Sequence, residues 1–133
     1  MKIIFTRTGG RARMICRRAD LTHTSADLGP SLPGHDLAHF VVERTLRLAS
    51  GFFVHIAKGY SIQRLSDAVV IHSLGAEPYV AEILARALGS LATGGCTADQ
   101  FPELVAAELE QMGLRVPGGV SVESAKLMLE ELQ

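Results

Sequence analysis

The chain has 133 residues, of which 47% are hydrophobic, and its formal net charge is −1. This size predicts one domain, and a chain so rich in aliphatic side chains is too apolar to be disordered. No apolar run approaches the roughly 20 residues of a membrane-spanning helix, and the start MKIIFTR lacks the longer apolar stretch of a secretory signal. We therefore expect a cytoplasmic protein, in which Cys16 and Cys96 are reduced thiols.

The first 18 residues predict a β-hairpin. Two β-rich runs, KIIFTR and ARMICRR, flank Gly9 and Gly10, a pair that accepts the positive φ angles of a tight hairpin turn. With the glycines at the turn, Phe5 lies opposite Met14 and Ile3 lies opposite Cys16. Alternation along the strands predicts one core-facing surface, made by Ile3, Phe5, Ala12, Met14 and Cys16.

The opposite surface of this hairpin is predicted to be basic. Six of the thirteen Lys and Arg residues precede Asp20, the first acidic residue, and the 115 residues from position 19 onwards carry a net charge of −7. Alternation exposes Arg11, Arg13 and Arg17, which suit an acidic or phosphate-bearing partner. Nucleic acid is the weaker expectation, because Phe5 faces the core and the chain has no Trp to stack on bases.

Downstream of the hairpin the sequence reads as mainly helical. The stretch 19–34 is rich in Ser, Thr, Asp, Gly and Pro and predicts a long connection. Apolar spacing predicts helices over 36–49, 77–92, 99–112 and 121–132. Residues 51–59 favour a helix over a strand, and 61–75 give mixed signals. The prediction is a single α+β domain over residues 1–133, with a hairpin at 2–18 packed against four or five helices in a mainly helical part at 35–133.

A candidate metal site lies at the start of the first predicted helix. His35 and His39 are four residues apart, so their rings lie one turn above each other and can reach one ion, as in many zinc half-sites. Glu43 continues the same ridge along the edge of the apolar face. It lies about 12 Å along the axis from His35, and so it can share an ion more readily with His39 alone.

Several residues are candidates for a further ligand. Glu108 falls on the apolar stripe of the helix predicted at 99–112, where a carboxylate must be paired, protonated or ligating. The other candidates are His23, His55 and His72. Structural alternatives stay open for each group. Glu43 can pair with Arg47, Glu108 can pair with Arg64 or Arg86, and the two histidines can bind backbone groups or Asp36 at the helix start.

The string His35-Asp36-Leu37-Ala38-His39 resembles the HExxH motif of zincin metalloproteases. The resemblance implies that His35 and His39 are zinc ligands and that Asp36 is the general base, although Asp is one methylene shorter than the Glu of the motif. The longer string GHDLAHFVVE, followed by Gly-Phe-Phe, resembles small bacterial proteins of unknown function that carry an HDLxHxxVE motif. That second resemblance implies no activity.

Two functional hypotheses follow. The first is a small metal-binding protein, with zinc as one candidate ion and metal-dependent hydrolysis as its enzymatic form, in which His35, His39, Glu43 and Glu108 are ligands and Asp36 handles the proton. The alternative is a non-enzymatic binding or regulatory module that engages an acidic partner through its basic hairpin. A homodimer is compatible with both, because the chain is strongly apolar and its stretch ALGSLATGG permits close contacts.

Overall fold

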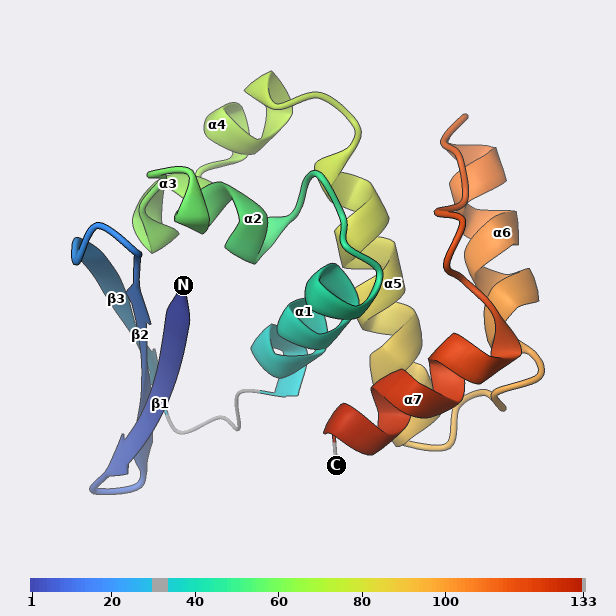
Figure 1. The fold of residues 1–133 in the computed structure, drawn as a ribbon, viewed down its shortest axis with the longest axis horizontal. Coiled ribbons are helices and arrows are strands. Elements are labelled where there is room, and N and C mark those ends of the chain that lie inside the picture. Colours follow the sequence, from blue (N-terminus) through green and yellow to red (C-terminus); the bar gives the residue numbers. More distant parts are fainter. Residues whose placement is uncertain (30–33, 133) are drawn as a thin grey trace.

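The computed structural model describes residues 1–29 and 34–132 and has an α+β architecture (Figure 1). A three-stranded antiparallel sheet precedes the helices and has the order β1-β2-β3. Its strands are β1 (Lys2–Thr8), β2 (Arg11–Arg17) and β3 (His23–Gly29). The helices in the described ranges are α1 (Gly34–Thr45), α2 (Phe52–Ala57), α3 (Ile62–Leu65), α4 (Ala68–Ser73), α5 (Pro78–Ala92), α6 (Phe101–Gln111) and α7 (Val122–Leu132).

The predicted hairpin is confirmed, including its register. Phe5 pairs with Met14 and Ile3 pairs with Cys16. Gly9 and Gly10 have φ angles of 60° and 77°, the left-handed values that the tight turn requires and glycine adopts at no steric cost. On the core face of β2, alternate side chains are almost fully buried: Ala12, Met14 and Cys16.

The prediction of a connection over 19–34 is wrong for residues 23–29, which form β3. Antiparallel pairing with β2 places Thr24 opposite Cys16 and Asp27 opposite Arg13, with an irregularity at Ala12 and Arg13. Thr24 is buried, and its hydroxyl accepts a hydrogen bond from the Ile62 amide at the start of α3 (3.1 Å). Backbone pairing and side-chain bonds such as this one order a segment whose side chains give no strand pattern. The rest of the predicted connection includes 30–33, which lie outside the described residues.

The helical part contains more helices than the four or five predicted, because three short ones follow α1. The stretch 51–59 contains α2, as expected, and the stretch 61–75, whose sequence gives mixed signals, contains α3 and α4. Helix α1 ends at Thr45, before the predicted end at residue 49. Arg47 has a left-handed φ of 50°, a conformation that an α-helix does not contain, so the chain turns there.

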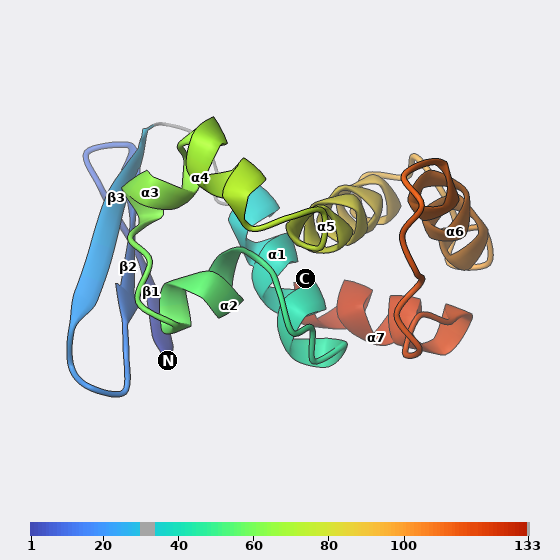
Figure 2. The same ribbon diagram turned by 90° about the horizontal axis from the view of Figure 1, so that it is seen from above.

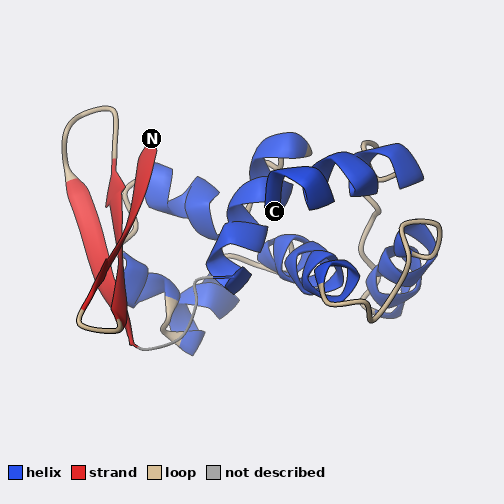
Figure 3. Cartoon of the chain, turned by 90° about the horizontal axis from the view of Figure 1, so that it is seen from below, coloured by secondary structure: helices blue, strands red, loops and turns tan. Residues whose placement is uncertain are grey.

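The buried apolar side chains of the described residues form two hydrophobic cores. Figure 2 shows the sheet at one end with α2 and α3 against it, and α6 and α7 at the other end. Figure 3 likewise gathers the strands at one end of a helical body. The larger core joins α1, α5, α6 and α7 and is centred on Val42, Leu84, Leu88, Phe101 and Val105. The smaller core joins the sheet, α2 and α3 and contains Met14, Cys16, Phe53, Ile56, Ile62 and Leu65. The polar residues of α1 therefore lie near the boundary between the two cores.

Among the helices of the described ranges, none combines the length and the hydropathy that crossing a bilayer requires. Both cysteines are buried and unbridged. Burial raises the pKa of the Cys16 thiol to about 11, so this side chain is an unreactive member of the smaller core.

Candidate metal centre

Helix α1 presents two histidines as its sequence spacing predicts. The rings of His35 and His39 are 4.8 Å apart between centroids and meet edge to face. Their surroundings differ, because the His35 side chain is 54% exposed whereas that of His39 is 8% exposed. One imidazole thus lies at the mouth of the site and the other lies inside it.

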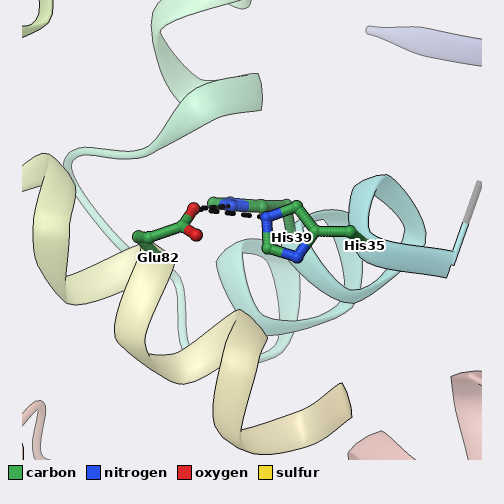
Figure 4. A group of neighbouring side chains, drawn as sticks. All are labelled: His35, His39 and Glu82. Carbon is green, nitrogen blue, oxygen red and sulfur yellow. Dashed lines mark hydrogen bonds and ion pairs between the residues drawn. The ribbon is translucent and has the colours of Figure 1, made fainter. Parts of the chain in front are cut away.

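The third member of the group is Glu82 on α5, which packs against α1 (Figure 4). Its Oε2 atom lies 2.7 Å from Nε2 of His39 and 3.3 Å from Nε2 of His35. One ligand atom from each residue falls within 4.8 Å of the other two, so the three side chains could hold one metal ion. Glu82 is not among the ligands that the sequence predicted.

Glu43 lies behind His39, away from the point where the three side chains converge. Its Oε2 accepts a hydrogen bond from Nδ1 of His39 (3.0 Å), and its Oε1 accepts one from the Val54 amide of α2 (3.0 Å). Glu43 is buried. The bond at Nδ1 fixes the orientation of the ring and leaves Nε2 directed toward Glu82, the role that carboxylates play behind metal-binding histidines.

The hydrogen bonds and charges within this cluster shift the pKa values of His39 and Glu82. Burial alone would lower the pKa of His39, but its hydrogen bonds and charge interactions with Glu43 and Glu82 outweigh that effect and raise the pKa to about 9. The hydrogen bond from His39 lowers the pKa of Glu82 to about 2, against the effect of burial. Without a metal, both ring nitrogens of His39 therefore carry a hydrogen at neutral pH, and the positively charged ring donates to the carboxylates of Glu43 and Glu82.

An apolar cavity of about 390 Å³ opens beside the cluster. His39 and Glu82 form part of its wall, and most of the rest comes from α2, α3, α4 and the start of α5. Its apolar lining includes Phe52, Leu65, Ile71 and Leu74. A volume of this size is typical of small-molecule sites.

The other predicted site residues lie elsewhere. Glu108 is exposed on α6, and its carboxylate pairs with Arg86 (3.4 Å), the structural alternative that the sequence left open. The predicted Glu43–Arg47 pair is not among the ion pairs of the described residues; Glu43 binds His39 instead. His55 and His72 line the cavity, whereas His23 is exposed at the start of β3.

Asp36 is half-buried on α1, next to His35 in the chain. Burial raises the pKa of its carboxyl group, and the charges of His35 and His39 oppose that shift. No hydrogen bond among the described residues joins Asp36 to the three converging side chains. Its assignment as a general base stays a prediction.

The basic face of the hairpin is partly neutralised by its own sheet. Arg11 binds the Asp27 carboxylate of β3 (3.0 Å), and Arg13 donates to the Ser25 hydroxyl (2.9 Å). Arg11, Arg13 and Arg17 are all exposed, as predicted. Because β3 was not predicted, the partners of these two arginines within the sheet were not predicted either.

Gly51 leaves the space that Glu43 occupies. A Cβ atom added at Gly51 would lie 2.5 Å from Cδ and 2.7 Å from Oε1 of Glu43. The Glu43 side chain cannot move aside freely because both of its oxygens are engaged, by His39 and by Val54. Gly51→Ala is therefore expected to lower the free energy of unfolding by about 1–3 kcal/mol, measured by urea denaturation of the metal-free protein.

The matched control for this substitution is Gly89→Ala. Gly89 lies within α5, and an added Cβ would meet nothing within 4 Å. Alanine there is expected to stabilise the helix by about 0.5–1 kcal/mol. Equal effects of the two substitutions would contradict the steric account of Gly51.

The arrangement as a whole is a pair of histidines on one helix, a carboxylate on a second helix, and a buried carboxylate that orients the inner histidine. No protein-family model matches the chain, and comparisons with curated proteins and with solved structures find no match. The chemistry of these residues therefore carries the functional argument.

Proposed function

We propose that the protein binds one divalent transition-metal ion, zinc by preference, through Nε2 of His35, Nε2 of His39 and the carboxylate of Glu82. The observation that carries the proposal is the convergence of these three groups at the point to which Glu43 directs His39. Two imidazoles and one carboxylate, without sulfur, form a common set of zinc ligands. The same set binds Fe²⁺ in non-haem sites, so both ions belong in the test.

The ligand set favours a catalytic rather than a structural role for the metal. Structural zinc sites have four protein ligands, whereas catalytic sites have three and keep one position for water or substrate. Here the third and fourth predicted ligands, Glu43 and Glu108, lie behind His39 and on the exposed side of α6. A zinc ion at this position would supply a Lewis acid and a bound water that ionises near neutral pH, which is the chemistry of metal-dependent hydrolysis.

Metal and proton compete for the same nitrogen of His39. In the metal-free protein Nε2 of His39 donates a hydrogen bond to Oε2 of Glu82 (2.7 Å). In the metal-bound protein this hydrogen bond would be lost, and both atoms would bind the ion instead. The bond from Nδ1 to Glu43 is compatible with both states, because Nδ1 keeps its hydrogen in a neutral histidine that ligates through Nε2. Positive charge therefore lies between the carboxylates of Glu43 and Glu82 in both states. Protonated His39 carries it in the metal-free protein, and the ion would carry it in the metal-bound protein.

Isothermal titration with Zn²⁺, repeated with Fe²⁺ under anaerobic conditions, tests the proposal. The wild-type chain is expected to bind one ion. His35→Ala and Glu82→Gln should each weaken zinc binding at least about 100-fold, because a lost ligand costs more than the 10- to 100-fold effect of a lost orienting group.

The matched controls are His72→Ala and Glu108→Gln. His72 is an exposed histidine of α4, and Glu108 is an exposed carboxylate outside the cluster. Zinc affinities of both controls should equal that of the wild type. Weak zinc binding by the wild type that survives His35→Ala and Glu82→Gln would overturn the proposal.

A further inference from the structure

The cavity beside the cluster has a mainly apolar lining, and two of its polar residues belong to the proposed metal centre. His39 and Glu82 belong both to the cluster and to the cavity wall. Away from them, Phe52 of α2, Leu65 of α3 and Ile71 of α4 make the lining mainly apolar. In Figure 1 these short helices lie together above α1 and beside the start of α5. A molecule in the cavity would therefore place one end at the ion and its remainder against aliphatic and aromatic side chains.

The charges around the cavity disfavour an anionic guest. Among the described residues that line it there is no Lys or Arg. A divalent ion would be balanced by the carboxylates of Glu82 and Glu43, so the site would be neutral before any guest binds. His55, another residue of the wall, adds no positive charge at neutral pH, because burial lowers the pKa of its imidazole. A phosphate or sulfate ester would bring uncompensated negative charge into an apolar space, which costs free energy.

We propose that this cavity is the substrate pocket of the metal centre and that it takes a small uncharged molecule with an apolar body and one oxygen donor, such as the carbonyl of an ester or amide. This inference rests on the proposed function, because the ion would bind the oxygen. The apolar body would lie between α2 and α4, against Phe52 and Ile71. The pocket would then select its ligand by the length of the apolar body and by the absence of a negative charge.

Alkyl hydroxamic acids are suitable probes, because they are uncharged in solution near neutral pH and bind zinc through their oxygen atoms with release of one proton. They thus bring one negative charge to the ion, whereas an alkyl phosphate brings nearly two. We expect the zinc-loaded protein to bind hexanohydroxamic acid more tightly than acetohydroxamic acid, by about fourfold for each added methylene group. Hexyl phosphate, of similar length but anionic, should bind at least about tenfold more weakly than hexanohydroxamic acid. Isothermal titration measures all three dissociation constants.

A matched pair of variants locates the binding. Ile71→Trp places a large ring in the cavity wall, and Val69→Trp places the same ring at a position of α4 that is 77% exposed. Ile71→Trp should weaken hexanohydroxamic acid at least about tenfold and leave acetohydroxamic acid within about twofold of the wild-type value, since only the longer chain reaches the wall. Val69→Trp should change neither dissociation constant. The comparison of chain lengths in the wild type tests the inference even where Ile71→Trp does not fold.

Zinc binding is titrated first on the same samples, which separates the two claims. A protein that binds zinc through the cluster but shows no dependence on chain length, or that prefers hexyl phosphate, contradicts the pocket and leaves the metal site standing. If Ile71→Trp weakened the binding of hexanohydroxamic acid and acetohydroxamic acid by the same factor, that result would also contradict the proposed pocket. A protein that binds no zinc overturns both claims.

Discussion

Replacing Glu43 with alanine is expected to lower the free energy of unfolding by about 3 kcal/mol and to weaken zinc binding about 10- to 100-fold. The side chain is 4% exposed and accepts hydrogen bonds from His39 and from the Val54 amide. Its removal leaves a buried imidazole and a partly buried amide without their acceptor, and it frees the His39 ring to turn. Urea denaturation of the metal-free variant measures the first effect, and isothermal titration with zinc measures the second.

Glu108→Ala is the control for this prediction. Glu108 also pairs with a basic side chain, but its own side chain is 52% exposed and its partner Arg86 is 57% exposed. Exposed ion pairs contribute at most about 1 kcal/mol, so this variant should remain close to the wild type in stability and zinc affinity. If Glu43→Ala behaved like Glu108→Ala, Glu43 would have no orienting role.

The metal-free protein is expected to lose stability as the pH rises from about 6.5 to about 9. His39 has a pKa of about 9 in the folded chain and an ordinary value of 6.5. The folded state therefore binds more protons than the unfolded state in this interval, and its advantage is complete below pH 6.5 and lost above pH 9. The difference in pKa corresponds to at most about 3 kcal/mol. Urea denaturation at pH 6 and at pH 9.5 measures it.

Glu82 produces the opposite trend in acid. The pKa of Glu82 is lowered from 4.5 to about 2, chiefly by the hydrogen bond from His39, so its contribution is present above pH 4.5 and is lost as the pH falls toward 2. Metal-free stability should therefore be highest between about pH 4.5 and 6.5. His39→Gln is the control variant, because it keeps a polar side chain but does not titrate. An alkaline decline that is as large in His39→Gln as in the wild type would show that another group causes it.

The sequence predicted those features that depend on residues close together in the chain. The Gly9-Gly10 turn and the alternation around it gave the hairpin register, and the four-residue spacing of His35 and His39 brought their rings together. Both results depend on neighbours within one hairpin or one helix turn. The same reasoning did not find β3, because Thr24 and its neighbours are ordered by pairing with β2 and by a bond to Ile62 rather than by apolar alternation.

The sequence patterns did not bring Glu82 into the candidate site and placed Glu108 in it, for two different reasons. Glu82 lies 43 residues from His39 in sequence, and only the packing of α5 on α1 brings the two side chains together. A signal was present in Ala81 and Ala85, whose small side chains beside Glu82 are fully buried and extend the packed face of α5 toward it. Glu108 was assigned to a buried stripe that was too wide, because Leu104 on the same stripe is 47% exposed.

The most direct test of the metal centre is a crystal structure of the zinc-loaded protein with anomalous diffraction data collected on both sides of the zinc absorption edge. We expect one strong anomalous peak, bonded to Nε2 of His35, Nε2 of His39 and the carboxylate of Glu82, with Glu43 still bound to Nδ1 of His39. Zinc at another position, or a loaded crystal in which His39 still donates to Glu82, would contradict the proposed metal centre.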